Sequence, residues 1–162
     1  MDIDNIVSAI RNIYQQVQDD PYHIKHLMNF TEQRPEISFK VCKESTYPYQ
    51  MFDEYYFNNN FRINKHSIVI PEWVIKRIIK TNTHNGMSVI EYNDYTGIPI
   101  NQMKRADYIT AIAIHELAHV FQLYIQDYET EEQHTEEFYD VLESFYDSEL
   151  VHMLRTSIDK YL

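Results

Sequence analysis

Glycine and cysteine are both scarce in this chain of 162 residues, and each scarcity excludes a class of protein. Gly86 and Gly97 are the only glycines, so the chain has no glycine-rich loop that could cradle a phosphate group. This excludes P-loop nucleotide hydrolases and dinucleotide-binding folds. Cys42 is the only cysteine, which excludes an internal disulfide framework and a cysteine-rich zinc ribbon.

The sequence also lacks the segments that direct a protein out of the cell or into a membrane. It begins Met1-Asp2-Ile3-Asp4, without the basic stretch and apolar core of a signal peptide. No apolar run is long enough to span a bilayer. We therefore expect one cytoplasmic domain over residues 1–162, with no membrane association.

Positive charge is scarce overall and is missing from one long span. The formal net charge is −11, and no Lys or Arg occurs from Ala106 to Leu154. This span is either an ordinary solvated acidic face or a negative field that attracts divalent cations or basic substrate segments. We expect no strong direct nucleic-acid binding, and a preference for basic or neutral peptide segments over acidic ones.

The hydrophobic pattern changes between helical and strand periods along the chain, which predicts an α+β fold. Helices are predicted at 3–17, from Pro21 through Met28, from Pro71 through Ile79, at about 103–126, around Phe138 to Phe145, and at about 148–161. Strands are predicted at 37–41, 63–70 and 87–92, with an irregular loop at 47–61. We expect a small, mainly antiparallel sheet packed on helices. One of its edges, formed by 63–70 or 87–92, would align an extended substrate by backbone pairing.

The most informative pattern is His-Glu-x-x-His, formed by His115, Glu116 and His119. Every variable residue from Ile112 to Phe121 is uncharged and none is proline, which predicts a central, buried helix, called the HExxH helix below. Positions i and i+4 of a helix share a face, so the two histidines can point at one metal ion. Glu116 lies beside them, within reach of a metal-bound water. The pattern is typical of zinc hydrolases, and the alternative is a core helix whose histidines only form hydrogen bonds.

A catalytic zinc ion usually has three protein ligands, so a third must come from elsewhere in the chain. The metzincin pattern is excluded, since it would require Gly and His where Gln122 and Ile125 stand. We expect His134 to be the third ligand, because it precedes Phe138 by one turn on the inward face of the next helix. The alternatives are nearby carboxylates, as in gluzincins: Glu131, Glu132, Glu136 and Glu137. Glu137 is the strongest of them, and it would otherwise orient an imidazole N–H.

These segments resemble the SprT-like and WLM group of HExxH zinc metallopeptidases. Those proteins combine a helical His-Glu-x-x-His with a downstream His-Gly-x-x-Phe segment that supplies the third histidine. This chain reads His134-Thr135-Glu136-Glu137-Phe138 there, and the resemblance covers roughly residues 104–145. It implies a zincin-like fold and a zinc-dependent metallopeptidase that hydrolyses peptide bonds. In that enzyme His115, His119 and His134 bind one catalytic zinc ion, and Glu116 is the general base.

The implied mechanism is metal-assisted peptide hydrolysis. Zinc lowers the pKa of its water to about 7, and Glu116 takes the proton and passes it to the leaving amine. An oxyanion donor is also needed, and the sequence does not decide among four neighbours: Tyr124, Tyr128, Tyr139 and His152. The other function considered is a catalytically inactive, metal-stabilised module that binds or regulates proteins. The presence of Glu116 favours the enzyme, because a structural zinc site needs no base.

Overall fold

The computed structural model describes residues 3–20, 36–43, 49–52, 57–58, 61–62, 65–125 and 132–162. In chain order its elements are α1 (Ile3–Asp19), β1 (Glu36–Cys42), β2 (Tyr49–Phe52), β3 (Phe57–Asn58), β4 (Phe61–Arg62), β5 (Lys65–Pro71), α2 (Glu72–Thr81), α3 (Met87–Thr96), the 3₁₀ helix η2 (Ile100–Gln102), α4 (Arg105–Ile125), α5 (Glu136–Asp147) and α6 (Leu150–Asp159). The α+β class is therefore confirmed. None of the helices within these ranges has both the length and the apolar run needed to cross a membrane.

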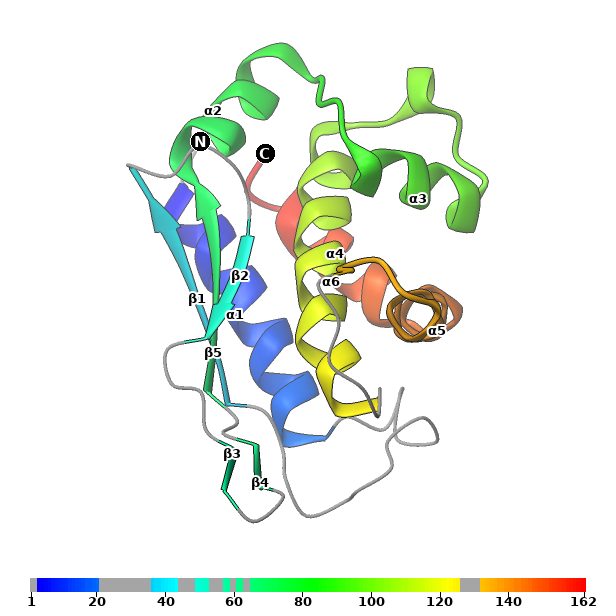
Figure 1. Cartoon of the computed structure of the whole chain (residues 1–162). Helices are drawn as coiled ribbons and strands as arrows, with labels where there is room; N and C mark the ends of the chain where they lie inside the picture. The colour runs from blue at the N-terminus through cyan, green and yellow to red at the C-terminus, as the bar shows by residue number, and fades with distance from the viewer. Residues whose placement is uncertain are drawn as a thin grey trace.

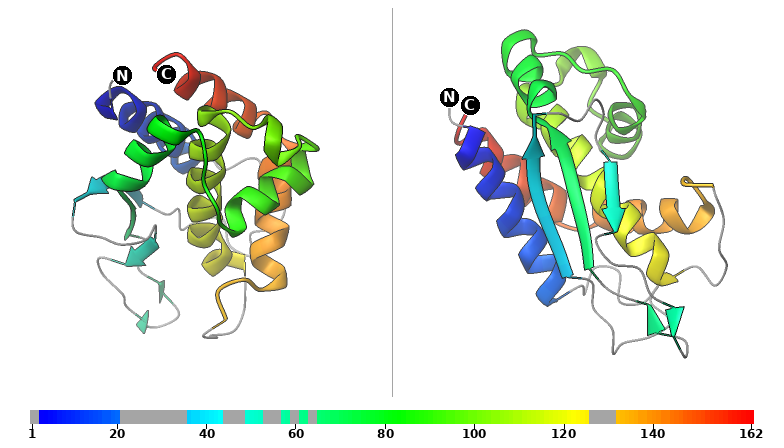
Figure 2. Two further views of the ribbon diagram at one scale, coloured as in Figure 1. Left: turned by 90° about the horizontal axis from the view of Figure 1, so that it is seen from above. Right: turned by 60° about the vertical axis from the view of Figure 1, so that its left-hand side comes forward.

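Helix α4 runs through the middle of the molecule, with the sheet on one side and α3 and α5 on the other (Figure 1). Every residue from Ala106 to Ala118 is buried, which confirms the prediction of a buried helix. Helices α1 and α6 lie side by side behind the sheet and α4 (Figure 2). Tyr14 of α1 contacts the ring of Phe39 in β1 edge to face and donates a 2.6 Å hydrogen bond to the carbonyl of Ala113 in α4. This tyrosine therefore ties the sheet to the HExxH helix.

The main sheet has the strand order β1-β5-β2, and its longest pairing is parallel. β1 and β5 pair over seven residues in parallel, whereas β2 pairs with β5 antiparallel over four. The prediction of a mainly antiparallel sheet is wrong. The alternation of apolar and polar residues sets which face of a strand is buried, but it does not set the direction of the neighbouring strand. A separate two-stranded pairing joins β3 and β4.

Two further predictions about strands are wrong. The segment 87–92 belongs to helix α3, which begins after Gly86 and ends at Gly97 with φ 75°. The segment predicted as an irregular loop, 47–61, contains β2 and β3 and the start of β4. Short apolar runs fit either a strand or a helix, and strands of two to four residues are too short for alternation to reveal.

The edge-strand prediction changes as a consequence. Residues 87–92 are helical, and β5, which contains most of 63–70, is the central strand of its sheet. Its described side chains, His66 to Pro71, are all buried, as expected for a strand with neighbours on both sides. The edge strand that contacts α4 is β2.

The remaining helix predictions agree with the structure within a few residues, except where the chain is not described. Predictions for 3–17, 71–79, 103–126 and 148–161 correspond to α1, α2, α4 and α6. The predicted helix from Pro21 through Met28 lies outside the described residues. Helix α5 begins at Glu136, with Thr135 as its N-cap.

The start of α4 is held by one buried carboxylate. Asp107 accepts hydrogen bonds from the backbone N–H of Lys104 at 2.8 Å and from the hydroxyl of Tyr92 at 2.6 Å. It also pairs with the guanidinium of Arg155 at 2.9 Å. The bond to Lys104 caps the first turn of α4, and the other two fasten that turn to α3 and α6. The HExxH helix is thus fixed against both neighbours.

Candidate metal centre

Three histidines converge beside α4, and we call them the histidine cluster: His115, His119 and His134. The first two lie one turn apart on α4, and the third precedes α5 in the chain. The Nε2 atoms of His119 and His134 lie 3.2 and 3.3 Å from Nε2 of His115. One ligand atom from each residue falls within 4.8 Å of the others. The structure therefore brings together the three residues that the sequence predicted.

Hydrogen bonds on the outer side of two rings determine where their lone pairs point. Nδ1 of His115 lies 2.6 Å from the carboxylate of Glu91, and Nδ1 of His119 lies 3.1 Å from the side-chain oxygen of Gln122. Both oxygens are acceptors, so each Nδ1 carries the proton and each Nε2 is left with its lone pair. Lone pairs so close repel one another unless a cation lies between them. His115 and His119 are thus arranged to offer their Nε2 lone pairs to a cation.

The spacing of the cluster fits a tetrahedral zinc ion. Zinc–nitrogen bonds of about 2.0–2.1 Å require tetrahedral ligand nitrogens to lie about 3.3–3.4 Å apart. The separations of 3.2 and 3.3 Å from Nε2 of His115 are close to that value. Three imidazoles leave the fourth position of the tetrahedron for a water or a substrate atom.

The ring of Phe138 packs against all three imidazole rings. It is fully buried, and its ring stacks on His119 with centroids 4.4 Å apart. It meets His115 and His134 edge to face, each at 5.1 Å. This packing restricts the imidazoles to the orientations in which their Nε2 atoms converge.

Gln122 links the HExxH helix to the segment that carries His134. Its side-chain oxygen accepts from His119, and its amide nitrogen donates to the hydroxyl of Thr135 at 3.0 Å. The same hydroxyl accepts from the backbone N–H of Phe138 at 3.4 Å and so caps α5. Thr135 stands where the SprT-like pattern has glycine, but its φ of −81° is open to any residue. Its hydroxyl holds together two parts of the site that glycine would leave unconnected.

Glu91 is the functional residue that sequence reasoning missed. It lies on α3, is only 5% exposed, and its carboxylate orients His115. Its other oxygen is buried and has no hydrogen-bond partner among the described residues. A signal was present in the sequence: on a helix Ser88, Val89, Glu91 and Tyr92 share one inward face. The strand prediction for 87–92 hid this pattern, because in a strand Glu91 and Tyr92 would point to opposite faces of the sheet.

Glu116 lies next to the cluster and is buried, with 7% of its surface exposed. Burial raises the pKa of Glu116 to about 7. The nearby His115 opposes this rise, whereas the Glu91 carboxylate adds to it. Burial lowers the pKa of His119 to about 3, with the neighbouring His115 acting in the same direction. The pKa of His134 is also lowered, by burial first and then by His115. The lowered values keep His119 and His134 neutral near pH 7, which is the form that binds metals.

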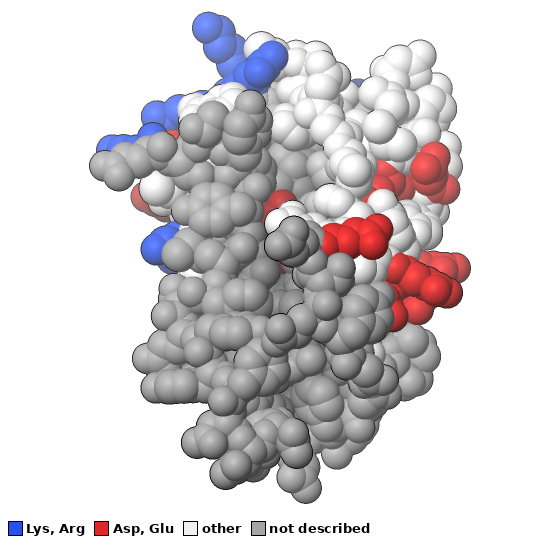
Figure 3. Space-filling view, in the orientation of Figure 1, with Lys and Arg blue, Asp and Glu red and all other residues white. Residues whose placement is uncertain are grey.

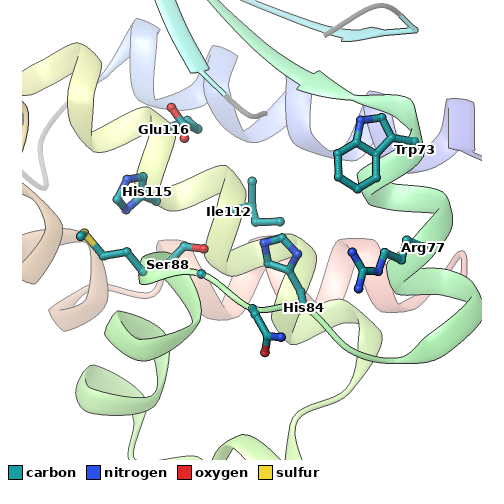
Figure 4. Close-up of a pocket in the computed structure, with 10 residues that line it drawn as sticks. Trp73, Arg77, His84, Ser88, Ile112, His115 and Glu116 are labelled. Atoms are coloured by element: carbon teal, nitrogen blue, oxygen red, sulfur yellow. The ribbon is translucent and has the colours of Figure 1, made fainter. Parts of the chain in front are cut away.

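A pocket of about 330 Å³ opens beside His115 and Glu116, which form part of its lining (Figure 4). Its walls come from α2, from the segment between α2 and α3, and from the start of α3. Ile112 lies one turn before Glu116 on α4. It forms the part of the pocket wall between α2 and the pair His115 and Glu116 (Figure 4). A substrate in this pocket would lie against the proposed base.

Other residues considered from the sequence lie outside the metal-ligating group found among the described residues. Glu132 and Glu136 are exposed and Glu137 is half-buried, whereas Glu131 lies outside the described residues. His134 itself precedes the N-cap of α5, so the prediction that it lies on the helix is wrong, although its side chain reaches the cluster. The Tyr139 hydroxyl lies 3.9 Å from the sulfur of Met87, and His152 is exposed on α6. Tyr128 and the side chain of Tyr124 lie outside the described residues.

No protein-family model, no curated protein and no solved structure matches this chain. The resemblance to the SprT-like and WLM group therefore stays a prediction that rests on the motif residues.

Proposed function

We propose that the protein is a zinc-dependent metallopeptidase whose histidine cluster binds one catalytic zinc ion. One observation carries this proposal: three histidines converge, with Nε2 of His115 at tetrahedral spacing from Nε2 of the other two, while a buried glutamate lies beside them. A structural zinc site has four protein ligands and no base next to it. Here the described group offers three ligands, and Glu116 opens onto a pocket large enough for part of a peptide.

The chemistry divides between the metal and the chain. A zinc ion held by the cluster would supply a Lewis acid that polarises a carbonyl group and makes water more acidic. The chain supplies Glu116, which takes a proton from the attacking water and later delivers it to the leaving amine. Burial, which raises the pKa of Glu116 to about 7, suits a group that must both accept and release a proton near neutral pH.

Two residues hold the ligands in position in this proposal. Glu91 accepts the Nδ1 proton of His115, and Gln122 accepts that of His119. Such outer partners fix the ring orientation and make the imidazole a stronger ligand. They do not touch the substrate, so their role is positioning.

A zincin-like architecture is part of the proposal. It is supported by a central HExxH helix beside a small sheet whose edge strand, β2, contacts α4 (Figure 1). We assign substrate alignment to the edge of β2 that faces away from β5, which has no paired strand among the described residues, in place of the two segments predicted from the sequence. An extended peptide would pair with the backbone of that edge and pass the histidine cluster.

Metal analysis and reconstitution test the proposal. The purified protein should contain one zinc ion per chain, cleave members of a broad peptide library, lose that activity with a chelator, and regain it with zinc. A protein that holds one zinc ion and cleaves no member of the library would instead be the inactive, metal-stabilised binding module. A protein that takes up no zinc would contradict both functions.

A further inference from the structure

The pocket beside Glu116 has two chemically different ends (Figure 4). His115 and Glu116 form the end next to the histidine cluster, whereas Trp73 and Arg77 of α2, with His84, form the other. The two ends are joined by Ile112 of α4. A substrate group that enters the far end is therefore connected through one pocket to the proposed base.

Arg77 is the charged group of that far end. It is exposed, and the ion pairs between described residues use Lys76, His115 and Arg155 as their cations, not Arg77. The neighbouring Lys76, by contrast, pairs with Glu72 at 2.9 Å and does not line the pocket. A guanidinium group offers a planar fork of donors that matches a carboxylate. Within the part of the chain that is described, no carboxylate occupies this fork.

The other residues of the far end favour an anion without competing for it. Burial lowers the pKa of His84, with Arg77 acting in the same direction, so His84 is a neutral hydrogen-bonding group near pH 7. Trp73 is 42% exposed and gives the wall an apolar face for the carbon stem of a substrate side chain.

The distribution of charge over the molecule also favours an anion at the far end of the pocket. In Figure 3 Lys and Arg side chains gather over α2 and the neighbouring strands, and Asp and Glu gather on the opposite side, over α3 and α5. The expected preference for basic segments came from the span 106–154, which includes α5 but not α2. The wall formed by α2 has the opposite sign and calls for the opposite substrate charge.

We infer that this pocket selects peptide substrates with a carboxylate group, which Arg77 binds while the peptide lies against the histidine cluster. The inference rests on the proposed function for its substrate class. The carboxylate belongs either to a Glu or Asp side chain near the scissile bond or to the C-terminus of the peptide. In both cases Arg77 is a specificity-determining residue and takes no part in the proton transfer.

A binding experiment tests this independently of cleavage. Trp73 is the only tryptophan of the chain and lines the pocket, so its fluorescence reports occupation directly. The zinc-loaded Glu116→Gln protein is titrated with hexapeptides in which one position at a time is Glu, Gln or Lys, each with an amidated C-terminus. The tightest-binding peptide is then compared with its free-acid form, which separates a side-chain carboxylate from a terminal one.

We expect a carboxylate at one position, or at the C-terminus, to tighten binding about tenfold over its neutral counterpart. Arg77→Gln should abolish that difference, Arg77→Glu should reverse it in favour of Lys, and the control Lys76→Gln should leave it intact. Equal affinity for Glu, Gln and free-acid peptides, or a preference for Glu that Arg77→Gln retains, would overturn the inference. If the wild type cleaves no peptide but these binding differences hold, the proposed peptidase activity is wrong and the carboxylate-binding role of Arg77 is supported.

Discussion

The carboxylate of Glu91 accepts a 2.6 Å hydrogen bond from His115, a residue 24 positions further along the chain. The bond joins α3 to the HExxH helix at a point where both residues are buried. Because it places the proton on Nδ1, it directs the Nε2 lone pair of His115 at the other two histidines. The geometry of the histidine cluster therefore depends on a helix that contributes no histidine to it.

Replacing Glu91 by alanine should weaken zinc binding by about 10–100-fold, because the Nδ1 proton of His115 loses its acceptor. Glu91→Gln should retain most of the affinity, since its amide oxygen can still accept that proton. Zinc affinity is measured by competition with a chromogenic chelator. Glu143→Ala, a change at an exposed position of α5, is the control. Wild-type affinity in Glu91→Ala would show that the bond does not orient the ligand.

Replacing His134 by alanine should remove zinc from the purified protein, because only His115 and His119 would remain as ligands from the cluster. Glu137→Ala should lose far less, as Glu137 lies outside the group of described residues that converge. Zinc content and the chelator-dependent shift in melting temperature are compared for the two variants. Full zinc occupancy in His134→Ala would transfer the third-ligand role to another residue.

Asp107→Ala should lower the free energy of unfolding by about 3 kcal/mol, since the change removes the buried acceptor shared by the Tyr92 hydroxyl, the Lys104 backbone N–H and the Arg155 guanidinium. Glu72→Gln, which removes a surface pair with Lys76, should leave stability almost unchanged. Urea unfolding of both variants measures the difference. Similar losses in the two variants would mean that Asp107 does not anchor α4.

Glu116 should make the metal-free protein less stable as the pH rises. Burial raises the pKa of this carboxyl to about 7 in the folded chain, from 4.5 in its ordinary state. The contribution of Glu116 to the free energy of unfolding is therefore fully present below about pH 4.5 and is lost as the pH rises through about 7. His119, whose pKa burial lowers to about 3, changes stability in the opposite direction, so wild type alone does not isolate Glu116.

The comparison that isolates it is Glu116→Gln against wild type, both treated with a chelator, in urea unfolding at pH 4 and pH 8. The variant should gain stability relative to wild type at pH 8 and show little gain at pH 4. An equal difference at both values would mean that Glu116 does not titrate as its burial requires.

Local spacing explains why most of the site was predictable. His115, Glu116 and His119 are separated by fixed helical intervals, so a helix alone brings them together. His134 was predictable from its place before Phe138, although it precedes the N-cap and does not lie on the helix. Most helices were predicted for the same reason, since their apolar residues recur at the helical period.

Tertiary placement explains what the sequence did not reveal. Glu91 reaches His115 only because α3 packs on α4, and the apolar run at its start fits a strand equally well. The parallel pairing of β1 with β5 depends on how the chain between them returns, which alternation does not encode. Arg77 reaches the pocket because of where α2 lies, and its own helix shows only a surface cation.

Whether Glu116 is the general base of a zinc peptidase is decided by the rate of peptide cleavage by zinc-loaded Glu116→Gln, at the same zinc content as wild type. We expect the variant to keep its zinc ion and to lose activity by about 10²–10⁴-fold, the usual contribution of a general base. Glu137→Gln, a matched change outside the converging group, should cleave at close to the wild-type rate. Cleavage by Glu116→Gln at the wild-type rate, with zinc bound, would contradict the role of Glu116 as general base.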